Sequence, residues 1–127
     1  PPNSPEEIYQ ALKAGVTVAI SSDSYLPVHP EAVGMEGIEL VGPKDLFKVC
    51  KPTFEYLHER GVSKVDCLKM ITTNAAKVMD LDAEIGVISR LKKADIILCK
   101  GIPVFDFTDT DSVVMVIKDG VVEIDKN

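Results

Sequence analysis

Most of the fold information in this chain lies in the stretch Ala14-Gly15-Val16-Thr17-Val18-Ala19-Ile20-Ser21-Ser22-Asp23-Ser24. Residues 16–20 form a short, nearly continuous apolar run, which is typical of a strand buried on both faces of a helix-covered parallel sheet. The run ends in small polar residues and the carboxylate of Asp23. Because active sites form at the carboxyl ends of such strands, the stretch predicts an α/β fold with a candidate site at Asp23.

Helices are predicted on both sides of this run. Ser4 and Glu7 form a capping-box pattern around Pro5, which indicates a helix start. A helical stretch is expected over residues 43–60, with a kink or a break at Pro52. Two shorter helices are expected to follow, over residues 64–71 and 75–79.

The chain becomes rich in β-forming residues after residue 80. Strands are predicted where aliphatic residues run together, at 84–88, 94–99, 113–117 and 121–124. Asp119-Gly120 predicts a tight hairpin turn between the last two strands. We therefore expect two parts, residues 1–81 and residues 82–127.

Length and composition exclude several classes of protein. The chain has 127 residues, of which 46% are hydrophobic and 27% charged, as in ordinary globular domains and unlike disordered chains. A complete (β/α)8 barrel needs about 250 residues and does not fit into this length. The net charge of −6 argues against a nucleic-acid partner, and no apolar run reaches the roughly 18–20 residues of a membrane span.

The cysteines Cys50, Cys67 and Cys99 form no Cys-x-x-Cys pair. An odd number without such a pair fits neither a disulfide framework nor a zinc knuckle, so we expect reduced thiols packed as small apolar side chains. Reduced thiols, together with an N-terminal sequence that does not resemble a signal peptide, favour a cytoplasmic location.

Taken residue by residue, the sequence offers one main candidate for chemistry. Asp23 can ligate a metal or act as a general base, although an aspartate at a strand end is commonly a loop cap. His29 can join a site or lie exposed in its loop, and His58 suits a surface position near a helix end. Tyr25 can contact a substrate or pack against the loop that follows Asp23.

Four stretches follow one another in an order that indicates a family. Residues 14–24 are similar to a "GV-x-VA-x-G(S/T)D" run, 70–81 to "T-x-N-P-A-K-x-x-G-L", 84–98 to "G-x-I-x-x-G-K-x-ADI", and 116–122 to a closing "V-x-x-G". This order resembles the C-terminal portion of the amidohydrolase superfamily, which includes imidazolonepropionase, cyclic amidohydrolases and deaminases. Among the departures from the motifs, Leu91 replaces a glycine and Ala75 replaces a proline.

The resemblance implies a fold and an activity. The fold would be the last part of a TIM-type (β/α)8 barrel followed by strands of a small composite β-sandwich domain. The activity would be hydrolysis of a non-peptide C–N bond in an amide or cyclic amide, or a deamination, by water that one or two divalent metal ions, often zinc, activate. Asp23 would ligate the metal and carry the proton, with Ser22 and Ser24 orienting it and Tyr25 near the substrate.

The other metal ligands of this family precede the aspartate, and they are absent from this chain. Its histidines, His29 and His58, both follow Asp23. We therefore expect the isolated chain to be inactive and to need the missing N-terminal portion of the same protein, or to self-associate as a homo-oligomer. The alternatives are a catalytically inactive scaffold or interaction protein that kept the fold, or an unrelated α/β module.

Overall fold

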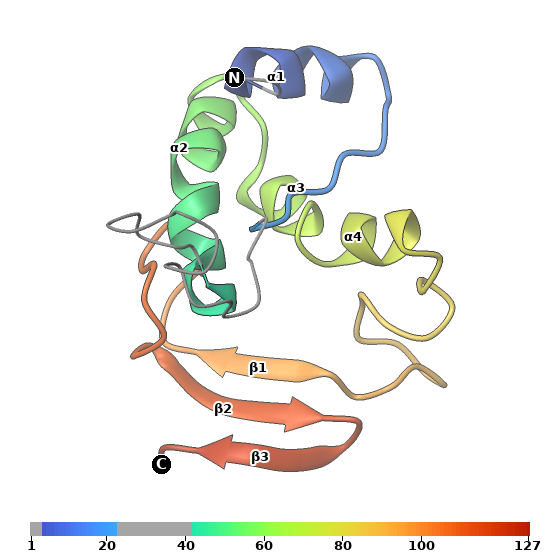
Figure 1. Cartoon of the computed structure of the whole chain (residues 1–127), viewed down its shortest axis with the longest axis vertical. Coiled ribbons are helices and arrows are strands. Elements are labelled where there is room, and N and C mark those ends of the chain that lie inside the picture. The colour runs from blue at the N-terminus through green and yellow to red at the C-terminus, as the bar shows by residue number, and fades with distance from the viewer. Residues whose placement is uncertain (1–3, 23–41) are drawn as a thin grey trace, which may run out of the picture.

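The computed structural model describes residues 4–22 and 42–127 (Figure 1). Four α-helices and one 3-10 helix lie above a three-stranded sheet in this view. No helix in these two ranges is long and apolar enough to cross a membrane. In chain order the elements are α1 (Pro5–Lys13), η2 (Pro43–Asp45), α2 (Leu46–Glu59), α3 (Lys64–Lys69), α4 (Thr73–Val78), β1 (Ile96–Cys99), β2 (Val113–Lys118) and β3 (Val121–Asp125).

The predicted start of α1 is confirmed. The Glu7 amide donates to Ser4 Oγ at 3.3 Å, and the Ser4 amide donates to Glu7 Oε2 at 2.8 Å. These reciprocal bonds satisfy two of the amides that a helix leaves without partners at its first turn. The helix ends at Lys13, just before Gly15, whose φ of 80° suits the left-handed conformation common after a helix.

Helix α2 is not split at Pro52, so the expected break is wrong. The helix is continuous from Leu46 to Glu59, and Pro52 is exposed on its surface. A proline removes one helical hydrogen bond, but α2 also presents Cys50, Phe54 and Leu57 to the interior, where all three are fully buried. Burial of this apolar face stabilises the helix and compensates for the hydrogen bond that Pro52 cannot form.

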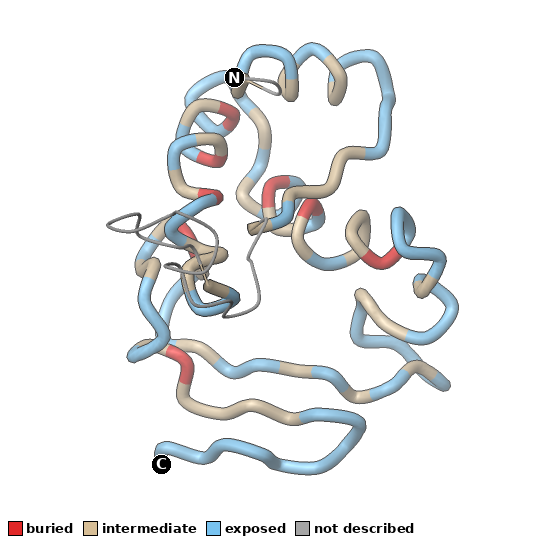
Figure 2. Tube along the Cα trace, in the orientation of Figure 1, coloured by how far each residue is buried: buried red, intermediate tan, exposed pale blue. Residues whose placement is uncertain are grey.

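The core lies where α2 meets α3 and the loop after β1 (Figure 2). Phe54 and Leu57 of α2 pack with Val104 of that loop, and the rings of Phe54 and Phe105 are stacked with centroids 5.8 Å apart. Partly buried residues of α1 and of the segment after it cover this centre. The fully buried members of the core are Cys50, Phe54, Leu57, Cys67, Met70 and Val104.

The prediction of a strand at residues 16–20 is wrong for the described part of the chain. Val16 is 54% exposed, and residues 18–20 are half-buried without forming a strand. A strand needs a neighbouring strand to take up its backbone hydrogen bonds, and none of the described strands lies beside this segment. Residues 16–20 therefore have the composition of a strand but pair with none of the described strands.

Residues 84–88 also form turns where the sequence predicted a strand. The amides of Glu84 and Ile85 both donate to Leu81 O, at 2.9 and 3.0 Å, which folds the chain back onto α4. Gly86 lies against this helix with a φ of 101°. Farther on, Leu91 adopts a φ of 68°, so the turn keeps a left-handed residue although leucine stands where the motif has glycine.

The other β predictions are confirmed with small shifts of their ends. The sheet is antiparallel in the order β1-β2-β3, with Ile96 opposite Ile117 and Val116 opposite Ile124. Asp119 and Gly120 form the hairpin turn, both with positive φ, as a tight turn between antiparallel strands requires. Every residue of β3 is exposed.

Gly86→Ala should destabilise the chain strongly. A Cβ at this position would come within 2.7 Å of Ala76 Cβ in addition to the cost of its positive φ. We expect a loss of about 3 kcal/mol in the free energy of unfolding, measured by urea denaturation. Gly61→Ala is the matched control, because Gly61 has a φ of 93° but open space around it, and should cost only about 1 kcal/mol. Equal losses would refute the packing argument.

Candidate functional site

Most residues of the predicted site lie outside the described part of the chain. Asp23, Ser24, Tyr25 and His29 belong to residues 23–41, which the structure does not describe. Ser22 is half-buried at the end of the described segment. The structure therefore describes residues 16–22, the segment that precedes Asp23, and the contacts that hold this segment. We call residues 16–22 the approach to Asp23.

Two hydrogen bonds fix the approach to Asp23 against the corner between α3 and α4. The Ile20 amide donates to Met70 O at 3.1 Å, and the side-chain amide of Asn74 donates to Val18 O at 3.0 Å. The side chains of Val18 and Ile20 pack against the core. Both polar and apolar contacts thus hold residues 18–20, although these residues form no strand.

A hollow of about 490 Å³ borders this approach between α1 and α2. The carboxylate in its lining, Glu7, accepts the Ser4 amide of the capping box. Glu7 is the one titratable residue among the described lining residues, so these residues supply no pair of titratable groups for acid–base chemistry. Its lining residues are Glu7, Ile8, Ala11, Val18, Ala19, Ile20, Ser21, Val49 and Thr53.

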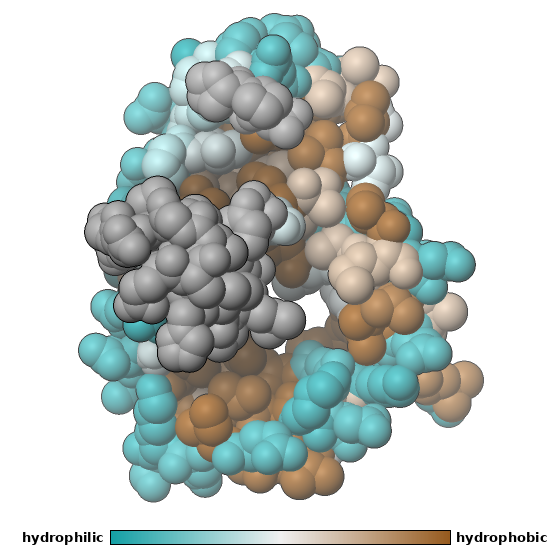
Figure 3. All heavy atoms as spheres, in the orientation of Figure 1, coloured by the Kyte–Doolittle hydropathy of each residue, from teal (hydrophilic) through white to brown (hydrophobic). Residues whose placement is uncertain are grey.

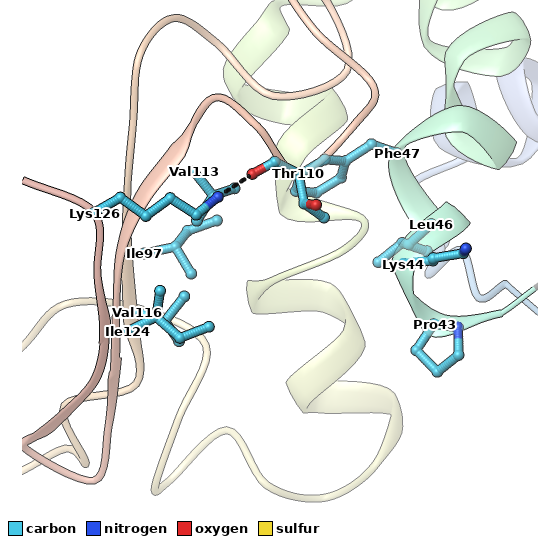
Figure 4. A pocket seen from close by; sticks show the side chains of 10 residues that line it. All are labelled: Pro43, Lys44, Leu46, Phe47, Ile97, Thr110, Val113, Val116, Ile124 and Lys126. Atoms are coloured by element: carbon cyan, nitrogen blue, oxygen red, sulfur yellow. Dashed lines mark hydrogen bonds between the residues drawn. The ribbon is translucent and has the colours of Figure 1, made fainter.

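A second hollow of about 490 Å³ lies between the start of α2 and the sheet (Figure 4). Figure 3 shows hydrophobic side chains gathered in the region of the sheet. Apolar side chains of both sheet and helix line this hollow, and the Lys126 ammonium group donates to Thr110 O at 2.9 Å along one side. The residues that line it offer no carboxylate, histidine or thiol. Its described lining residues form an apolar surface that includes two lysines, Lys44 and Lys126. The lining residues are Pro43, Lys44, Leu46, Phe47, Ile97, Thr110, Val113, Val116, Ile124 and Lys126.

The described residues do not assemble a metal site. Within residues 4–22 and 42–127, no three histidine, cysteine, aspartate or glutamate side chains come together. Burial raises the pKa of the Cys50 and Cys67 thiols to about 11, so both thiols are protonated at neutral pH. A carboxylate such as Asp23 is a suitable donor for a divalent ion, but one donor does not complete a coordination shell.

His58 lies exposed at the end of α2, as the sequence predicted. Its Nδ1 lies 2.9 Å from Val62 O, and its ring meets the edge of Phe105 with centroids 5.5 Å apart. These contacts tie the end of α2 to the chain after it and to the loop after β1. His58 therefore has a structural position among the described residues.

Thr73 and Asp95, which belong to two of the motif stretches, have structural roles that the residue pattern alone did not reveal. Thr73 Oγ1 donates to Gly86 O at 3.1 Å and so joins α4 to the turn after it. Asp95 accepts the Lys118 ammonium group at 2.6 Å and the Asp119 amide at 2.8 Å, which fastens the hairpin turn to the start of β1. The only signal for these roles in the sequence was the position of each residue in its motif.

Asp95 is held in its charged form by these partners. The Lys118 ammonium group, and after it the Asp119 amide, lower the pKa of the Asp95 carboxyl below its usual range. The carboxylate therefore stabilises the folded chain at neutral pH. The charged Asp95 carboxylate therefore holds the hairpin turn against the start of β1.

The family model of the Amidohydrolase family matches residues 6–122. The chain belongs to this family. No curated protein matches the sequence. The match covers the approach to Asp23, the helices and the sheet, and it confirms the family that the order of the motifs predicted.

Solved structures show the same likeness. An amidohydrolase from Thermotoga maritima MSB8 is 27% identical with a TM-score of 0.64, over 96% of this chain and 26% of that one. A Xaa-Pro dipeptidase with bound methionine is 25% identical with a TM-score of 0.63, over 94% and 25%. A β-aspartyl dipeptidase from Fervidobacterium islandicum AW-1, in complex with a β-Asp-Leu dipeptide, is 27% identical with a TM-score of 0.56, over 96% and 29%.

The chain spans about a quarter of the length of these solved structures. The family and its neighbours place the chain in a TIM-barrel superfamily. The described residues themselves form helices and a three-stranded antiparallel sheet.

Asp95→Asn should make stability less dependent on pH. Because the folded pKa of Asp95 is lowered, its contribution is present above the unfolded value of about 3.9 and is lost as pH falls through the folded pKa. The free energies of unfolding of the two proteins, measured from pH 2 to pH 7, should differ most above about pH 5 and converge in acid. Lys118→Met removes one of the two partners and should reproduce part of this difference. A difference that stays constant with pH would contradict the assignment.

Proposed function

We propose that this chain is the C-terminal portion of a metal-dependent hydrolase that cleaves a C–N bond in a small molecule. The observation that carries the proposal is the family match over residues 6–122, which includes Asp23 at the motif position of a metal-site aspartate. Amides, cyclic amides and aminated rings are the bonds that this resemblance implies. The two dipeptidases among the similar structures add dipeptide amides to the candidates.

Asp23 is the residue that we assign to the chemistry. Its carboxylate would ligate a divalent ion, take a proton from the attacking water and pass it to the leaving nitrogen. The ion, zinc in this proposal and one or two in number, would lower the pKa of bound water towards about 7. Ser22 and Ser24 would orient the carboxylate, and Tyr25 would border the substrate.

The remaining metal ligands would come from the rest of the full-length protein. In that protein, residues 1–81 would contribute the last barrel strand with its helices, and residues 82–127 part of a small β-domain. Two features support this division: residues 16–20 have a strand-like sequence but pair with none of the described strands, and β3 is an exposed sheet edge. We propose that these surfaces dock with the N-terminal portion, or with a second copy of the chain when it is isolated. No described feature favours an inactive scaffold.

Asp23→Asn in the full-length protein should abolish hydrolysis. Removing a ligand that also transfers the proton should lower kcat at least about 1,000-fold. The assay is release of free amine or ammonia from a panel of amides, cyclic amides and dipeptides, with bound metal measured by mass spectrometry. Glu59→Gln, an exposed change at the end of α2, should leave both values unchanged. Full activity in the Asp23 variant would refute the assignment.

The 127-residue chain alone should neither hydrolyse this panel nor bind zinc stoichiometrically. One carboxylate cannot replace the four or more donors of a zinc shell, and the described residues add no cluster. Calorimetric titration with Zn²⁺ checks this expectation, with the full-length protein as the positive control. Tight one-to-one uptake by the isolated chain would contradict it.

A further inference from the structure

Asn74 connects two parts of the chain that are far apart in the sequence. It is the second residue of α4, and its side-chain amide nitrogen donates to Val18 O at 3.0 Å across 56 positions. The Ile20 amide donates to Met70 O, at the C-terminal end of α3. The two bonded residues of the approach are two positions apart, the spacing at which an extended chain presents groups on one edge.

The helix that carries Asn74 is itself fixed on its other side. Thr73 Oγ1 donates to Gly86 O at 3.1 Å, and Ala76 is 4% exposed beneath Gly86. The Leu81 amide returns to Ala76 O at 2.8 Å. Asn74 therefore projects from a rigid support, which is the condition for a hydrogen bond to set the position of its partner.

We propose that Asn74 is a positioning residue. Its hydrogen bond to Val18 O would hold residues 18–22 in place and thereby orient the backbone that leads to Asp23. Asp23 follows Ile20 by three positions in the sequence, so the proposal is that order in residues 18–22 affects the carboxylate of Asp23. The effect on Asp23 rests on the proposed function. Hydrogen-bonding partners that orient a metal ligand change metal affinity about 10–100-fold when they are removed.

The test compares Asn74→Leu with Thr73→Val in the full-length protein. Each change keeps the approximate size of the side chain and removes one hydrogen bond from the first turn of α4. Asn74→Leu should speed hydrogen exchange of the Ile20 amide about fivefold and weaken Zn²⁺ binding about tenfold or more. Thr73→Val should leave both within about twofold of the wild type, despite a similar loss of the urea midpoint. The packing of Ala76 under Gly86 and the bond from the Leu81 amide to Ala76 O still hold α4 in this variant.

A second variant guards against general destabilisation. Asn74→Asp keeps the shape of the side chain but cannot donate to Val18 O, and it should reproduce the faster exchange and the weaker binding of Asn74→Leu. Equal exchange of the Ile20 amide in the Asn74 and Thr73 variants would overturn the inference. Wild-type protein that binds no Zn²⁺ would refute the proposed function instead, while the exchange comparison would still decide whether Asn74 holds the approach.

Discussion

The structure depends on the apolar contact between α2, α3 and the loop after β1. Phe54 and Leu57 meet Val104 there, and no polar or charged residue is buried among the described ones. Val104 adopts a φ of 72°, an unfavourable conformation for a β-branched residue. Its complete burial in the apolar cluster offsets this strain. Val18 and Ile20 of the approach to Asp23 pack against this cluster, and the loop after β1 contributes Val104 and Phe105 to it, so the core holds both segments.

Hydrogen bonds from the corner between α3 and α4 connect the core to the segments at its edge. Met70 belongs to the core and also accepts the Ile20 amide, whereas Asn74 and Thr73 reach outward to Val18 and Gly86. One short helix thereby joins the approach to Asp23 with the turn that leads to the sheet. The motif stretch of residues 70–81 supplies most of the residues of this junction.

The surfaces of the chain are consistent with its share of the longer solved structures. Residues 16–20 have the composition of a buried strand, yet Val16 is 54% exposed and none of the described strands pairs with them. The exposed strand β3 and the apolar hollow beside α2 are further unpaired surfaces in the described regions. A chain that spans about a quarter of such structures has fewer partners with which to cover its apolar segments.

The sequence by itself determined the features whose partners lie within a few residues: the Ser4–Glu7 capping box, the Ser63 cap of α3 and the turn at Asp119. It also determined the family, because the order of the motifs is a property of the chain alone. Only the tertiary structure decided that residues 84–88 form turns and that residues 16–20 pair with none of the described strands. It also decided that Asn74 and Asp95 form hydrogen bonds to groups far away in the sequence. The bond of Asn74 joins groups 56 positions apart and the bonds of Asp95 join groups 23 and 24 positions apart, and folding alone brings such groups together.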